Sequence, residues 1–206
     1  MASPLRGRAP KSDWSKTLAE APDFTETQIT SELVFDGRML KVREDEVLLP
    51  DGKTARREYV LHPGAVIILP LLDSETVLIE RQFRYPLRRH FYELPAGKME
   101  QGEEPLETAK RELIEECGYE AALWQHLMTM HPCIGYSDER IELYLARDLT
   151  YVGHALDEGE FLQVLEMPLA QALAWVREGR ITDVKTITGL LWLQAERTRP
   201  EFSASR

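Results

Sequence analysis

Residues Gly97–Tyr119, GKMEQGEEPLETAKRELIEECGY, place glycines, carboxylates and one arginine at a spacing that predicts a loop, a helix and a divalent-metal site. Pro105 suits the first position of a helix, and Gly118 suits the residue just past the last turn. Acidic residues near the start favour the positive end of the helix dipole. The segment therefore predicts a helix from Pro105 to Cys117 with a glycine-containing loop before it.

The predicted helix has an apolar face and an acidic face. At about 100° per residue, one stripe is expected to pack on a sheet: Leu106, Ala109, Leu113 and Cys117. Glu112, Glu115 and Glu116 gather on another face, where a hard cation such as Mg²⁺ would offset their mutual repulsion. Arg111 can bridge carboxylates and hold their rotamers, and a folded-back loop would bring Glu103 near it.

A solvated, glutamate-rich helix is the alternative interpretation of such carboxylates. The whole pattern is more specific: Gly97, five residues, Glu103, seven residues, Arg111-Glu112, Leu113, one residue, Glu115-Glu116, one residue, Gly118. Its chance frequency over the chain is about 10⁻⁷ to 10⁻⁶ at average residue usage. The pattern resembles the complete signature of the Nudix hydrolases.

This resemblance implies an α+β fold, namely a Nudix-type α/β/α sandwich around a mixed sheet. It also implies hydrolysis of a nucleoside diphosphate linked to another group, in which water attacks phosphorus with the help of Mg²⁺ or Mn²⁺. The implied metal ligands are Glu112, Glu115 and Glu116, together with the backbone carbonyl of Ala96. Arg111 and Glu115 are also expected among the catalytic residues.

Three flanking segments resemble the ADP-ribose pyrophosphatase branch: residues 56–66 (RREYVLHPGAV), 78–86 (LIERQFRYP) and 135–146 (GYSDERIELYLA). The resemblance implies cleavage of ADP-ribose to AMP and ribose 5-phosphate. A GDP-linked sugar is the alternative substrate, and a ligand-sensing module without turnover is the alternative from another class. Ile134 departs from the branch, which usually has proline before the glycine that aligns with Gly135.

The same resemblance suggests individual roles outside the helix. Glu139 matches a glutamate that lies near the attacking water, whereas Glu115 or Glu116 is the alternative base and a surface glutamate is the structural alternative. Arg84 matches a phosphate contact. Arg56 and Glu58 match positions that reach across a dimer interface towards the substrate, although exposed strand residues are the simpler interpretation. Phe35 is a candidate to stack on adenine, although an aromatic residue in a strand is more often part of the core.

The pattern along the chain predicts four regions. Residues 1–28 lack a sustained period and are expected to form a flexible arm. Strand patterns at 31–37, 38–50 and 54–62 predict an antiparallel β subdomain at 29–62, expected to serve dimerisation and substrate contacts. Residues 63–200 are expected to form the hydrolase domain, and 201–206 a tail. Within that domain the patterns predict strands at 65–72, 76–85, 90–96, 123–130, 140–146 and 161–165, and helices at 169–178 and 184–197.

Composition narrows the partners of the 206-residue chain. A formal net charge of −10 disfavours a nucleic-acid backbone as the main partner. The two cysteines cannot form a disulfide framework, and the longest apolar stretch is too short to cross a bilayer. Composition therefore predicts a cytoplasmic protein with neither nucleic acid nor membrane as partner. The family resemblance adds the expectation of a homodimer that acts on a small nucleoside diphosphate sugar.

Overall fold

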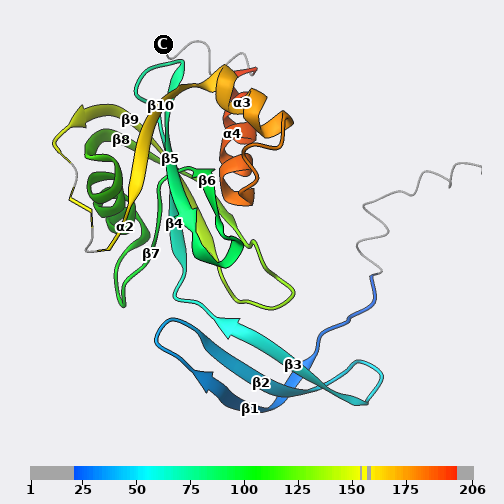
Figure 1. Cartoon of the computed structure of the whole chain (residues 1–206). Coiled ribbons are helices and arrows are strands. Elements are labelled where there is room, and N and C mark those ends of the chain that lie inside the picture. The colour runs from blue at the N-terminus through cyan, green and yellow to red at the C-terminus, as the bar shows by residue number, and fades with distance from the viewer. Residues whose placement is uncertain (1–20, 154, 157–158, 199–206) are drawn as a thin grey trace, which may run out of the picture.

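The computed structural model describes residues 21–153, 155–156 and 159–198 (Figure 1). Residues 1–20 of the expected arm and the expected tail at 201–206 lie outside these ranges. Thr27 and Gln28 fall within the range expected for the arm but belong to the first strand.

An antiparallel three-stranded sheet begins the described chain and lies beside the main body as a separate sheet (Figure 1). The end of its last strand contacts the main body, where the Val60 N–H donates to the Tyr136 carbonyl at 2.9 Å. Its strands are β1 (Thr27–Asp36), β2 (Lys41–Leu48) and β3 (Thr54–Leu61). Two short connections join neighbouring strands, and the turn after β2 contains Gly52 at φ 82°, a conformation that glycine adopts without strain. The predicted N-terminal antiparallel sheet is confirmed.

The body of the protein contains a mixed four-stranded sheet in the order β7-β4-β9-β8. Strand β4 runs parallel to β9 and antiparallel to β7, and β8 pairs antiparallel with β9. An antiparallel sheet, β10-β5-β6, lies beside it. The bounds are β4 (Ala65–Pro70), β5 (Thr76–Arg84), β6 (Arg89–Glu93), β7 (Ala96–Lys98), β8 (Tyr119–Met130), β9 (Ile141–Tyr151) and β10 (Leu162–Pro168).

Helices cover both faces of these sheets. Helix α2 (Pro105–Glu112) lies on one side, and α3 (Leu169–Arg177) and α4 (Val184–Arg197) lie on the other (Figure 1). Side chains of β4 alternate between the two resulting cores: Ile67 and Leu69 join the cluster with α3 and α4, whereas Val66 and Ile68 join the cluster with α2. Because helices bury both faces, β4 reads as a continuous apolar run. The predicted α/β/α sandwich is confirmed.

The helix of the opening segment covers the predicted range but is not α-helical throughout. After Glu112 the chain continues as a π-helical turn, Leu113–Cys117, and ends at Gly118 with φ 78°. The predicted apolar stripe packs inward, with Ala109 and Leu113 fully buried. A π turn adds a residue to the turn and is frequent at functional sites. Consecutive residues Glu116 and Cys117 are both buried there.

Several strand boundaries differ from the prediction, and three of the differences lie in the hydrolase domain around the signature helix. The single strand expected at 90–96 is two strands, β6 and β7, which belong to different sheets and are separated by Leu94 and Pro95. Strand β8 starts at Tyr119, directly after Gly118, and β9 runs on to Tyr151. These extensions are largely exposed and lack the apolar run that marks a buried strand.

No helix in the described ranges is long and apolar enough to cross a membrane.

Candidate active site

A cavity of about 990 Å³ opens where β4, β7 and α2 meet the start of α4. Seven of the predicted site residues line it, although they come from distant parts of the chain: Arg84, Ala96, Arg111, Glu112, Glu115, Glu116 and Glu139. The other three, Phe35, Arg56 and Glu58, lie on the N-terminal sheet and are not among the lining residues. The fold thus unites the acidic helix face with Arg84 and Glu139.

Arg111 is the centre of a carboxylate network. Its Nε and Nη2 donate to the two oxygens of Glu103 at 3.0 and 3.1 Å. Its Nη1 donates to Glu112 and to Glu115, each at 2.9 Å. The hydrogen bonds from Arg111 lower the pKa of Glu103 to about 2, so this carboxylate stays ionised. Arg111 therefore ties the loop before α2 to the acidic face of the helix.

Glu112 packs on the backbone of Gly97. A β-carbon at position 97 would occupy the space of the Glu112 carboxylate. Burial raises the pKa of Glu112, although the charge of Arg111 opposes that effect. The glycine at this position therefore lets the backbone of β7 approach the carboxylate closely.

Glu116 is the most enclosed of the three helix carboxylates. Its side chain accepts a hydrogen bond from the Ala96 backbone N–H at 3.0 Å. Burial, together with the neighbouring Glu80 and Glu112, raises the pKa of Glu116 to about 10. Glu80, on β5, accepts a hydrogen bond from the Cys117 thiol at 3.2 Å, and burial raises its pKa to about 8. Such crowded, buried carboxylates favour either protonation or a cation.

The described residues include no group of three His, Cys, Asp or Glu side chains arranged to hold a metal ion. Arg111 binds two of the predicted ligands, and the third binds the Ala96 N–H. The donor set nevertheless suits a hard cation, since it consists of carboxylate oxygens and a nearby backbone carbonyl. Glu112, Glu115, Glu116 and Ala96 therefore stay a prediction as metal ligands.

Glu139 lies in the cavity wall on the segment before β9. Its Oε1 is 3.7 Å from Nε2 of His62, and its N–H donates to Ser137 Oγ at 3.1 Å. His62 Nδ1 accepts the Gly64 N–H at 3.1 Å, so neutral His62 carries its proton on Nε2, the nitrogen that faces Glu139. His62 therefore lies beside the Glu139 carboxylate, at a distance longer than a hydrogen bond.

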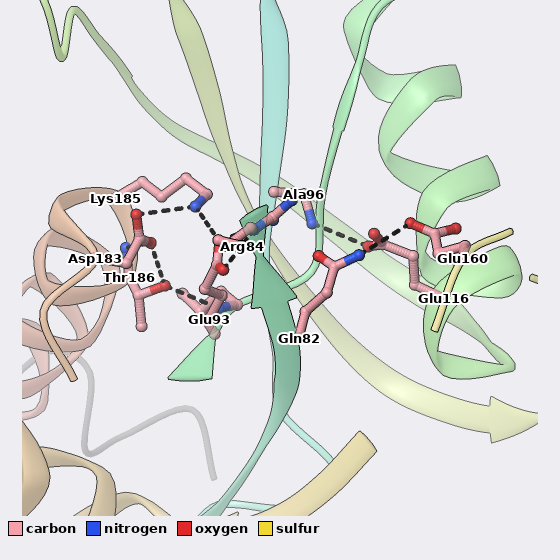
Figure 2. A network of polar contacts seen from close by, with 10 residues as sticks. Gln82, Arg84, Glu93, Ala96, Glu116, Glu160, Asp183, Lys185 and Thr186 are labelled. Atoms are coloured by element: carbon pink, nitrogen blue, oxygen red, sulfur yellow. Dashed lines mark hydrogen bonds and ion pairs between the residues drawn. The ribbon is translucent and has the colours of Figure 1, made fainter. Parts of the chain in front are cut away.

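A second polar network supplies basic groups to the cavity (Figure 2). Arg84 donates from Nε and Nη2 to the two oxygens of Glu93 at 2.7 and 2.9 Å. Lys185 Nζ lies 2.6 Å from Glu93 Oε2 and 2.9 Å from Asp183 Oδ1. Burial works to raise the pKa of Glu93, but the hydrogen bond from Arg84 and the charge of Lys185 outweigh it and lower that pKa.

The sequence pattern does not predict every side chain that lines the cavity. Lys185 and Glu160 both line the cavity, and Glu160 Oε1 accepts a hydrogen bond from Gln82 at 3.5 Å. Glu93 lies two residues before Pro95, close to the decisive segment, but one acidic residue in a strand carries no distinctive signal. Lys185 belongs to a C-terminal helix, so only the folded chain brings it to the site.

The three predicted site residues on the N-terminal sheet do not line the cavity of their own chain. Arg56 forms an exposed ion pair with Glu44 at 2.8 Å, and Glu58 lies directly across from Glu44 in the β2–β3 register. Phe35 on β1 is 55% exposed, so it is not a core residue of this chain. Further exposed apolar side chains on this sheet are Ile29, Leu33 and Val34, whereas Met39 and Leu40 of its first turn are exposed but line the cavity. The sheet thus presents an uncovered apolar surface.

The sandwich and its carboxylate-lined cavity define a class of enzyme, the hydrolases that carry their acidic residues on a loop–helix–loop segment. The NUDIX domain family matches residues 61–187, and the chain belongs to this family. The nucleoside diphosphate sugar hydrolase N-terminal domain matches residues 26–60, the stretch that contains the separate sheet.

Comparisons with known proteins agree with this assignment. The chain is 41% identical over 175 residues to the methanol dehydrogenase activator of Bacillus methanolicus, covering 84% of this chain and 95% of that protein. It is 40% identical over 171 residues to the ADP-ribose pyrophosphatase of Bacillus subtilis, covering 82% of this chain and 92% of that protein. The GDP-mannose pyrophosphatase of Citrobacter koseri is 31% identical over 150 residues, covering 68% and 78%. A crystal structure of an ADP compounds hydrolase shares the fold, with a TM-score of 0.76, 22% identity and coverage of 85% and 98%.

Proposed function

We propose that this protein is a Mg²⁺-dependent hydrolase that cleaves the diphosphate bond of ADP-ribose, giving AMP and ribose 5-phosphate. The observation that carries the proposal is that the carboxylates of α2 and of the following π turn line the same cavity as Arg84 and Glu139. The 40% identity to an ADP-ribose pyrophosphatase, over most of both chains, supports this substrate.

Glu112, Glu115, Glu116 and the Ala96 carbonyl would hold the Mg²⁺ or Mn²⁺ ions. The metal would neutralise diphosphate charge and activate water. The protein's own contribution begins with Arg111, which holds Glu112 and Glu115 in fixed rotamers. Arg84 offers a planar cationic group to a phosphate oxygen, a role to which arginine is suited.

Glu139 would accept the proton of the attacking water. Carboxylates serve as general bases when they lie within hydrogen-bond reach of the reacting water. His62 lies beside that carboxylate, with its Nε2 3.7 Å from Glu139 Oε1. Glu115, on the helix itself, is the alternative base, because it lies on the same cavity and is partly exposed.

The working form would be a homodimer with composite sites. Phe35, Arg56 and Glu58 do not line the cavity of their own chain, and the sheet that carries them presents an uncovered apolar surface. A second copy packed on that surface would bury it and bring these residues to the partner's cavity. Phe35 would then be available to stack on the adenine ring.

Two observations favour other candidates. The GDP-mannose pyrophosphatase relative favours a GDP-linked sugar, which would use the same metals with different base contacts. The methanol dehydrogenase activator relative favours a regulatory role towards a dehydrogenase. A non-catalytic ligand sensor is disfavoured because all of the signature carboxylates are present.

The test is a panel of nucleoside diphosphate sugars incubated with the purified protein and Mg²⁺, with products separated by chromatography. ADP-ribose is expected to have the highest kcat/KM and to yield AMP and ribose 5-phosphate. A higher kcat/KM for GDP-mannose would move the assignment to the GDP-sugar branch. No turnover of any member of the panel would leave only the regulatory role.

A further inference from the structure

One buried carboxylate joins two cationic side chains on the cavity wall. Glu93 accepts from Arg84 with both oxygens and from Lys185 with Oε2 (Figure 2). Without Glu93, two positive groups that bind the same carboxylate would repel each other. The carboxylate therefore holds Arg84 and Lys185 as an adjacent pair, and both residues line the cavity that contains Ala96 and Glu116.

Each cation keeps a donor for a ligand. An ammonium group has three N–H donors, and within the described chain the Lys185 Nζ has two partners, Glu93 and Asp183. Arg84 uses Nε and Nη2 on Glu93, and among the described residues its Nη1 has no acceptor. Two neighbouring cationic donors suit an anion with several oxygens, such as a phosphate group.

Lys185 is held in place before any ligand arrives. Asp183 Oδ2 accepts from the N–H and the hydroxyl of Thr186 at 3.0 and 2.7 Å, which caps α4. The Thr186 hydroxyl in turn accepts the Leu94 N–H at 2.8 Å. The start of α4 is thus tied to the segment that leads to Ala96, and the Lys185 side chain is only 17% exposed. An ordered side chain loses little further conformational entropy when it binds.

The other basic groups of the cavity are placed differently. Arg38 and Lys98 line it but are exposed, and Arg111 is engaged by three carboxylates. Much of the remaining lining is acidic, which repels a diphosphate wherever no cation intervenes. The joined pair of Arg84 and Lys185 is therefore the part of the wall best suited to phosphate oxygens.

We propose that Lys185 is a substrate-binding residue that, together with Arg84, binds phosphate oxygens of the diphosphate group. This inference rests on the proposed function and adds to it a contact from the C-terminal helix. Glu93 is then a positioning residue, because it acts by holding the two cations side by side.

The test compares wild type with Lys185→Met, which removes the charge, and Lys185→Arg, which keeps it. KM and kcat are measured with ADP-ribose and Mg²⁺, and binding of ADP-ribose and of inorganic pyrophosphate is measured by calorimetry in EDTA. Loss of a charged hydrogen bond is expected to raise KM and both dissociation constants about ten-fold in Lys185→Met, with a smaller change in kcat. Lys185→Arg is expected to recover most of the affinity.

Lys110→Met is the matched control, because Lys110 pairs with Glu107 on α2 and does not line the cavity. Its KM is expected to stay within about two-fold of wild type. Unchanged KM and dissociation constants in a folded Lys185→Met protein would overturn the inference, whatever its melting temperature. An effect on ADP-ribose without one on pyrophosphate would assign Lys185 to a sugar hydroxyl and overturn the phosphate contact.

The role of Lys185 can still be decided if the Lys185→Met variant does not fold or if the wild type shows no turnover. If Lys185→Met does not fold, the double variant Glu93→Gln/Lys185→Met removes the unbalanced carboxylate and is measured in its place. If wild type hydrolyses none of the nucleotide sugars, the proposed function fails, while the difference in pyrophosphate binding still decides the role of Lys185.

Discussion

Gly97 and Glu112 are in direct contact, and a β-carbon on Gly97 would overlap the Glu112 carboxylate. The Glu112 carboxylate can therefore occupy its position only because residue 97 has no side chain. A side chain at position 97 would displace Glu112, which also accepts a hydrogen bond from Arg111. This relationship explains in physical terms why the spacing between the two residues matters.

Gly97→Ala is therefore expected to lower kcat/KM for ADP-ribose by at least about ten-fold, because a displacement of reacting groups by about 1 Å is costly. Steady-state kinetics with circular dichroism as a check on folding would measure this. Gly102→Ala is the control. Gly102 has φ 81°, and a β-carbon there would meet no atom within 4 Å, so alanine strains the backbone without touching Glu112. Equal kinetic losses in the two variants would contradict the packing explanation.

Glu116→Gln is expected to reduce kcat by about 100-fold or more, because the amide keeps the size of the side chain but is a poor ligand for a hard cation. Chelation of divalent ions with EDTA is expected to abolish wild-type turnover, and added Mg²⁺ to restore it. Glu107→Gln serves as the control on the same helix, since Glu107 is exposed and pairs only with Lys110 among the described residues. Full turnover by Glu116→Gln would remove Glu116 from the set of metal ligands.

Between pH 5 and about 9, the ionisation of Glu116 is expected to lower the stability of the metal-free protein as the pH rises. The pKa of Glu116 is about 10 in the folded protein, against 4.5 for the free side chain. The folded state therefore favours the protonated form, and its contribution is present below pH 4.5 and is lost as the pH rises towards 10. Glu116→Gln cannot ionise, so its melting temperature in EDTA should exceed that of wild type by a margin that grows between pH 5 and about 9. Parallel melting curves at all pH values would contradict this.

Glu139→Gln is expected to lower kcat by about 100-fold to 10,000-fold with a small effect on KM, as for removal of a general base. Glu115→Gln, measured beside it, distinguishes the two candidate bases. An unimpaired Glu139→Gln together with an inactive Glu115→Gln would move the base to the helix.

Arg56→Ala and Glu116→Gln are each expected to be impaired alone but to complement each other when mixed. In a composite dimer, one of the two sites of the mixed species combines an intact Glu116 with an intact Arg56 from the other chain. Random exchange of subunits then restores about a quarter of wild-type activity. Light scattering measures the mass in the same samples, and an active monomer at assay concentration would rule out a composite site.

The helix of the opening segment could be predicted because its signals are local. Pro105, Gly118 and the apolar stripe act within a few residues, and the structure follows them. The π turn at Leu113–Cys117, which buries Glu116 and Cys117, had no local signal of this kind in the sequence. The division of residues 90–96 between two sheets follows from tertiary pairing.

The sequence by itself determined the family, the sandwich and the acidic face of α2, because a helix places residues three and four positions apart on one side. Only the tertiary structure decided which distant groups complete the cavity. Strand β5 supplies Arg84 and α4 supplies Lys185 to the cavity wall, and Glu93 on β6 binds both of these side chains. Their meeting depends on how sheets and helices pack, and ion pairs between remote residues leave no periodic pattern along the chain.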